Sequence, residues 1–197
     1  PKVLHVETKG THPSYPSTGK KKGDSTWRCK ECHGWDYMGI DGAYSSGSHK
    51  TGIKSIRAMA GQDLSMIAEI LMNDTHAFGK MIPEDSIRAL AKFVSEGQVD
   101  MDKYIDRATK MAKGDAKRGE KFYVNTCTKC HGEDGKKINF KNKEKPEYLG
   151  TVANKNPWEV LHKVRFGQPA SKMLTTLFLS IQDQVDIVAY SQTLPSK

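Results

Sequence analysis

The stretch Cys29-Lys30-Glu31-Cys32-His33 returns later in the chain as Cys127-Thr128-Lys129-Cys130-His131. Both stretches read C-x-x-C-H, and together they use all four cysteines of the 197-residue sequence. Two disulfides would not explain a histidine directly after each pair. A zinc site built from two C-x-x-C pairs usually has a spacer of about 15–20 residues, whereas these pairs begin 98 residues apart. The repeated pattern is therefore explained neither by two disulfides nor by a zinc site.

Two thiols three positions apart on a helical turn can add across the two vinyl groups of a porphyrin. The histidine that follows is then placed beneath the iron. We therefore predict two covalently bound haem c groups, one for each copy of the pattern. The predicted attachment residues and proximal iron ligands are Cys29, Cys32 and His33 for haem 1, and Cys127, Cys130 and His131 for haem 2.

The composition suits a chain that folds around such groups. Hydrophobic residues make up 37% of the sequence and the mean hydropathy is −0.64, so the protein core alone would be thin. A large apolar porphyrin would give each half a core. The formal charge of +8 could steer the protein towards an acidic redox partner. We expect no nucleic-acid partner, since no basic stretch interleaves with aromatic residues, and no transmembrane segment, since no run of about 20 apolar residues occurs.

The predicted fold is all-α, with a few helices and long irregular loops around each haem. Residues 1–98 form the first predicted domain, including an irregular tail in which His5 and His12 are expected to be exposed. Residues 99–114 are expected to form a partly helical linker, and residues 115–197 the second domain. The apolar spacing predicts helices after Asp63, after Pro83 and after Pro157, and over residues 180–193, while residues 132–154 are expected to form a lysine-rich loop.

The two halves can be laid over one another, which indicates a duplicated unit. His33 and His131 are 98 residues apart, and Phe93 and Tyr190, which occupy similar places in the last helix of each half, are 97 apart. A near-constant offset at both ends is typical of an internal repeat.

By these features the chain resembles a dihaem c-type cytochrome made of two class I cytochrome c domains, from Trp27 onward. The resemblance implies that Met173, in a loop ahead of the final helix, is the axial methionine of haem 2. It also implies that Gly119 and Phe122 or Tyr123 pack closely against the last helix. The first half departs from the family because no equivalent helix precedes Trp27.

The repeat transfers the distal position to the first half. Moving 97 residues back from Met173 reaches His76, which we predict to be the distal ligand of haem 1. Met81 is the competitor, but it lies only two residues before Pro83, and His49 is a weaker third candidate. A bis-histidine haem 1 would have a lower reduction potential than a His/Met haem 2, so electrons would pass downhill from haem 1 to haem 2.

The resemblance implies a carrier that transfers single electrons between redox partners rather than an enzyme, because both irons would be six-coordinate. A dihaem redox enzyme and an electron-transfer subunit of a larger oxidoreductase complex are the alternatives. Covalent haem attachment takes place outside the cytoplasm in bacteria, and the chain begins at Pro1 without a signal peptide. We therefore expect a periplasmic or otherwise exported protein; the sequence says nothing about its oligomeric state or its donor and acceptor.

Overall fold

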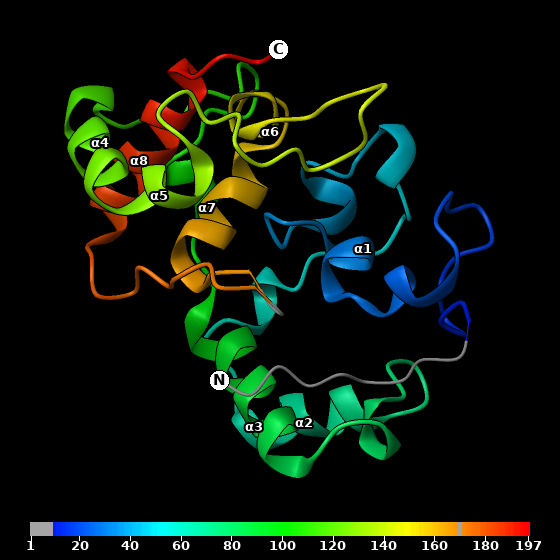
Figure 1. Cartoon of the computed structure of the whole chain (residues 1–197). Coiled ribbons are helices and arrows are strands. Elements are labelled where there is room, and N and C mark those ends of the chain that lie inside the picture. The colour runs from blue at the N-terminus through cyan, green and yellow to red at the C-terminus, as the bar shows by residue number, and fades with distance from the viewer. Residues whose placement is uncertain (1–9, 169–170) are drawn as a thin grey trace. The chain divides into compact units, whose positions relative to one another are not determined.

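The computed structural model describes residues 10–168 and 171–197. In these residues the regular structure is helical and no β-strand occurs, so the predicted all-α fold is confirmed. The α-helices in the described residues (Figure 1) are α1 (Cys29–His33), α2 (Leu64–Met72), α3 (Glu84–Lys92), α4 (Ala116–Phe122), α5 (Thr128–His131), α6 (Leu149–Lys155), α7 (Pro157–Phe166) and α8 (Ile181–Thr193). The chain divides into two compact units, Pro1–Val99 and Asp100–Lys197.

Short helical turns and loops connect these helices. The 3-10 turns are Gly23–Trp27, Gly39–Asp41, Gly47–His49, Arg57–Met59, Phe78–Lys80 and Met101–Lys103, and single π-helical turns cover Phe93–Gly97 and Tyr123–Cys127. The second π-helical turn leads directly into α5. The described helices are each too short or too polar to cross a membrane.

In the first unit, α2 and α3 pack side by side (Figure 1). Asp63 caps α2 by accepting a hydrogen bond from the amide of Met66 at 3.0 Å, as the sequence predicted for this helix start. The facing side chains Ile67, Leu71, Ile87 and Ala91 are buried and form the apolar core of this pair.

In the second unit, α4 crosses α8 at very short range. A Cβ added to Gly119 would lie 1.9 Å from the backbone oxygen of Asp186, so only glycine permits this approach. One turn further along, the rings of Tyr123 and Tyr190 have centroids 5.1 Å apart. The predicted packing of Gly119 and Tyr123 against the last helix is confirmed.

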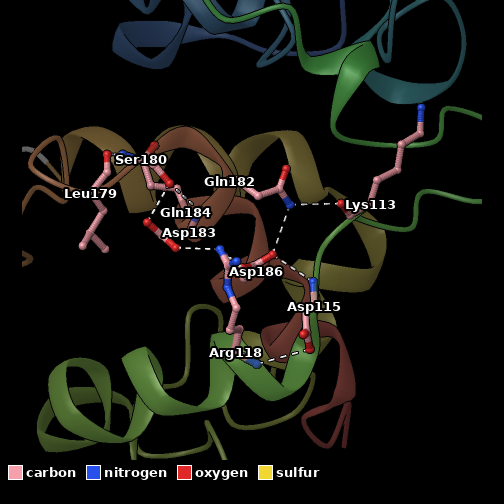
Figure 2. Close-up of polar contacts among 9 residues, drawn as sticks. All are labelled: Lys113, Asp115, Arg118, Leu179, Ser180, Gln182, Asp183, Gln184 and Asp186. Carbon is pink, nitrogen blue, oxygen red and sulfur yellow. Dashed lines mark hydrogen bonds and ion pairs between the residues drawn. The ribbon is translucent and has the colours of Figure 1, made fainter.

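A polar cluster ties the beginnings of α4 and α8 together, as Figure 2 shows. Asp186 is buried, yet its carboxylate accepts from the amide of Asp115 at 2.8 Å and pairs with the guanidinium of Arg118 at 2.8 Å. The same guanidinium contacts Asp183 at 2.7 Å. A buried carboxylate needs such partners, so this cluster fixes where α4 and α8 meet.

Residues 100–112 pack within the second unit. Met101 and Ile105 are buried, and the side chain of Gln192 bonds both the amide of Ala112 and the carbonyl of Lys110. The loop predicted as far as Asn154 is wrong in its last part, because α6 begins at Leu149. Gly150 makes α6 possible there, since a Cβ would lie 2.3 Å from the Leu194 carbonyl oxygen.

Candidate haem sites

The two C-x-x-C-H stretches adopt the same local geometry. Both end a short helix at their histidine, and the next residue is a glycine at positive φ: Gly34 has φ 76° and ψ 163°, and Gly132 has φ 81° and ψ 163°. Only glycine adopts this conformation readily. The amide of each glycine bonds back to the second residue of its motif, at 3.0 and 2.8 Å. The backbone therefore has the same conformation directly after each of the two histidines.

The four cysteines are free thiols in the structure, and no cluster of three or more metal-binding side chains occurs among the described residues. Burial raises the pKa of Cys32 and of Cys127 to about 11, with the neighbouring cysteine of each pair adding to the shift. Both thiols are therefore neutral near pH 7.

The His33 side chain is held by a backbone carbonyl. Its Nδ1 lies 3.0 Å from the carbonyl oxygen of Lys54, so Nδ1 carries the proton and Nε2 keeps its lone pair. The Lys54 carbonyl reaches this position because Gly39 (φ 53°) lets the two segments touch: a Cβ there would lie 2.2 Å from Ile53 O and 2.8 Å from Lys54 O. Hydrogen bonding of this kind orients metal-binding histidines.

His76 is held in the same manner. Its Nδ1 lies 2.9 Å from the carbonyl oxygen of Ile70, one of the last-turn carbonyls of α2 that have no partner within the helix. The negative end of the helix also favours the Nδ1–H donor at this place. His76 therefore also presents Nε2 as a free donor of an electron pair.

The structure brings His33 and His76 together. Their ring centroids are 6.4 Å apart and their planes differ by 21°. With a metal–nitrogen bond of about 2 Å and a nitrogen roughly 1 Å from the ring centre, two imidazoles on opposite sides of one metal ion would have centroids roughly 6 Å apart. Burial lowers the pKa of both histidines, which favours the neutral ring that metals bind.

The competing residues of the first unit, Met81 and His49, have other contacts. Met81 is half-buried in the turn that leads to α3, where its amide bonds the Phe78 carbonyl at 2.9 Å. The His49 ring stacks on Tyr44 with centroids 4.7 Å apart, and its Nδ1 lies 3.4 Å from a carboxylate oxygen of Glu31.

Glu31 is a buried carboxylate within the first motif. Burial acts to raise its pKa, but the nearby His49 side chain and the Lys30 ammonium outweigh burial and lower the pKa to about 2. Glu31 is therefore ionised within the first motif, where it pairs with the Lys30 ammonium.

The prediction that His12 is exposed is wrong, because its side chain is buried and only 8% exposed. Its amide bonds the hydroxyl of Thr26 at 2.8 Å, and its Nε2 lies 3.0 Å from the backbone oxygen of His76. His5 lies outside the described residues. The sequence shows no pattern that links His12 to His76, because the two are 64 residues apart and meet only in the tertiary structure.

The second site is built differently around His131. Burial lowers its pKa, but among the described residues its buried Nδ1 has no hydrogen-bond partner. The ring of Phe140 lies 6.1 Å away, and the hydroxyl of Tyr123 holds the next residue by donating to the Gly132 carbonyl at 2.7 Å. Met173 is half-buried, and its amide donates to the Ser171 hydroxyl at 3.1 Å.

These residues fit covalent haem. The first site has paired neutral imidazoles at the spacing of two axial ligands beside two free thiols. The second has a buried histidine nitrogen without a hydrogen-bond partner among the described residues, two free thiols and a methionine in the same compact unit. In such sites the chain's residues would hold the porphyrin through the cysteines and the iron through the histidines.

The comparisons with known proteins bear on the second site. Residues 116–195 match the family model Cytochrome c, a segment that contains the second C-x-x-C-H stretch and Met173. Comparison with curated proteins and with solved structures gave no match. The matched segment supports a c-type cytochrome with a haem-based role in electron transfer.

Proposed function

We propose that this protein is a dihaem cytochrome c that transfers single electrons between redox partners in the periplasm or another exported location. Haem 1 is held by Cys29 and Cys32 and ligated by His33 and His76. Haem 2 is held by Cys127 and Cys130 and ligated by His131 and Met173. When bound, haem c supplies an iron that changes its charge by one electron. The observation that carries the proposal is the His33–His76 pair, 6.4 Å between ring centroids.

The bond from each Nδ1 to a carbonyl oxygen supports the ligand assignment for haem 1. Each ring has one nitrogen occupied and the other free, at 3.0 Å for His33 and 2.9 Å for His76. This leaves Nε2, the nitrogen that would bind iron, available on both rings. Met81, the competitor, has no comparable support, since it sits in a tight turn after Phe78.

The equal geometry of the two motifs supports a count of two haems. The glycines that follow His33 and His131 have the same ψ of 163° and nearly the same φ. Because the cytochrome family match covers residues 116–195, the second motif is the reference, and the first repeats its local conformation.

The two ligand sets support different reduction potentials. A thioether ligand raises the potential of haem relative to a second imidazole. In addition, donation from Nδ1 to a carbonyl makes an imidazole more basic, and both ligands of haem 1 have this bond while His131 lacks a partner among the described residues. Both effects place haem 1 at the lower potential.

A basic surface on the second unit supports an acidic partner. This unit has 18 Lys and Arg against 12 Asp and Glu, a formal charge of +6, whereas the first unit has 13 against 11, or +2. The loop that follows His131 exposes Phe140 and Ile138 together with Lys141, Lys143 and Lys145. Its shape is fixed, because the Asn139 side-chain oxygen accepts from the amides of Lys141 and Glu147, both at 3.0 Å.

The first experiment counts the haems and separates the two sites. A pyridine haemochrome assay and intact mass should give two haems for the wild type, and one each for Cys29→Ser/Cys32→Ser and Cys127→Ser/Cys130→Ser. The former variant should retain the far-red sulfur-to-iron charge-transfer band and the latter should lose it. A wild-type protein with one attached haem contradicts the dihaem proposal.

The second experiment separates His76 from Met81. His76→Ala should open one ferrous haem to carbon monoxide and leave the far-red band in place, while the matched variant Met81→Ala should bind no more carbon monoxide than the wild type. A far-red band that survives Met173→Ala but disappears in Met81→Ala would exclude the proposed ligands.

The partner surface is tested with small redox ions of opposite charge. Reversing Lys141, Lys143 and Lys145 to glutamate should slow electron exchange with the hexacyanoferrate anion at low salt and leave exchange with the hexaammineruthenium cation equal or faster. Equal effects on both ions would rule out an electrostatic role for this loop.

A further inference from the structure

His12 is a buried side chain that the proposed electron transfer does not itself require. Both of its ring nitrogens are engaged. The amide of Ser14 donates to Nδ1 at 3.1 Å, so in the neutral ring Nε2 carries the hydrogen. That hydrogen is directed at the backbone oxygen of His76, 3.0 Å away. His12 is therefore not a free ligand; it is a donor to the residue proposed as distal ligand.

The ring of His12 lies near aromatic side chains from two other segments of the chain. Its centroid lies 4.3 Å from that of Trp27 and 6.3 Å from that of Phe78, which follows His76 by two residues. Trp27 is itself anchored, because its indole Nε1 donates to the Gly10 carbonyl at 3.0 Å. The segment before the first motif is thus fastened to the loop that carries His76.

The His76 loop needs such a restraint. Ala77 has φ 58°, in the left-handed region that non-glycine residues rarely adopt, and this conformation costs on the order of 1–3 kcal/mol unless the surroundings impose it. On the helix side, Asn73 accepts from the amides of His76 and Ala77 at 3.2 and 2.7 Å. From outside residues 64–82, the side chain of His12 bonds the His76 backbone oxygen.

We propose that His12 is a positioning residue: its Nε2–H bond to the His76 carbonyl locks the distal loop so that the His76 ring faces His33. The inference rests on the proposed assignment of His76 as a ligand of haem 1. Without the bond, the loop can leave the left-handed conformation at Ala77, and the population with His76 away from the iron rises.

The test uses the matured holoprotein and three variants. His12→Phe keeps an aromatic ring between Trp27 and Phe78 but removes the donor. His12→Gln restores a donor close to the position of Nε2. Trp27→Phe breaks the anchor to Gly10 and leaves the bond to His76, so it controls for general loosening of the segment. The readouts are carbon monoxide binding to the ferrous protein and the electron paramagnetic resonance spectrum of the ferric protein, which reports the relative orientation of the two imidazoles.

We expect His12→Phe to raise carbon monoxide binding at one haem by roughly three- to tenfold, the change in an equilibrium constant that follows from one lost hydrogen bond, and to shift the low-spin ferric signal. His12→Gln and Trp27→Phe should stay close to wild type in both readouts. If His12→Phe does not mature, His12→Asn takes its place, because its shorter amide cannot reach the His76 carbonyl.

The inference is overturned if the donor-free variant matches the wild type, if His12→Gln changes as much as His12→Phe, or if Trp27→Phe has the same effect. Failure of the proposed function looks different. In that case the wild-type protein itself shows no bis-imidazole ferric signal.

Discussion

Gly119→Ala tests the closest helix contact of the second unit. The added Cβ would lie 1.9 Å from the backbone oxygen of Asp186, 2.4 Å from its carbonyl carbon and 3.0 Å from the amide of Ile187. All three atoms belong to the backbone of α8, so no side chain can rotate away. The two helices must separate instead, and the buried partners of Asp186 separate with them.

The expected cost follows from two opposing effects. Overpacking of a well-packed core typically destabilises by about 1–3 kcal/mol, and the contact with backbone places this site at or above the upper end. Alanine gains about 1 kcal/mol over glycine in a helix. We therefore expect a net loss of about 2 kcal/mol or more in the free energy of unfolding, which lowers the Tm of a unit of this size by roughly 8–16 °C.

The assay is thermal unfolding of the holoprotein followed by circular dichroism. Glu120→Ala, at the exposed neighbouring position of α4, is the matched control and should leave the Tm near the wild-type value. A Gly119→Ala protein as stable as the wild type would refute the reasoning, since the close contact with α8 would then cost no more than the helix propensity gain of about 1 kcal/mol.

Three further predictions follow from single contacts. Arg118→Met leaves the buried carboxylate of Asp186 without its cation and should cost about 1–3 kcal/mol in urea denaturation; a loss that is equally large in an Asp186→Asn background would show that the pair does not matter. Burial, aided by nearby cations, lowers the pKa of His162 from 6.5 to about 4, so the unfolded chain binds the proton more readily. Stability should be complete above pH 6.5 and fall by on the order of 2–3 kcal/mol towards pH 4, and a His162→Phe variant with the same pH slope would contradict this. Gly39→Ala should displace the carbonyl that accepts from His33 Nδ1 and shift the lower of the two potentials in a redox titration, and an unchanged pair of potentials would count against that role.

Local features of the sequence predicted local structure well. Asp63 and Ser180 accept the capping hydrogen bonds that their helix starts require, and Pro157 begins α7. These positions depend only on the next few residues, as helix caps do. The prediction of a lysine-rich loop was wrong where α6 begins, because the close packing of Gly150 against the distant Leu194 carbonyl is a tertiary contact that local sequence does not reveal.

The sequence by itself determined the paired thiols, the histidine after each pair and the glycine that ends each motif, because covalent attachment and a positive φ are properties of neighbouring residues. The offset of the repeat pointed to His76, but only the tertiary structure shows how its ring is held near that of His33, since the two are 43 residues apart and Nδ1 of His76 bonds the end of α2. The same holds for the burial of His12 and of Asp186. Each depends on partners from distant segments, and the periodicity of the sequence does not predict such long-range contacts.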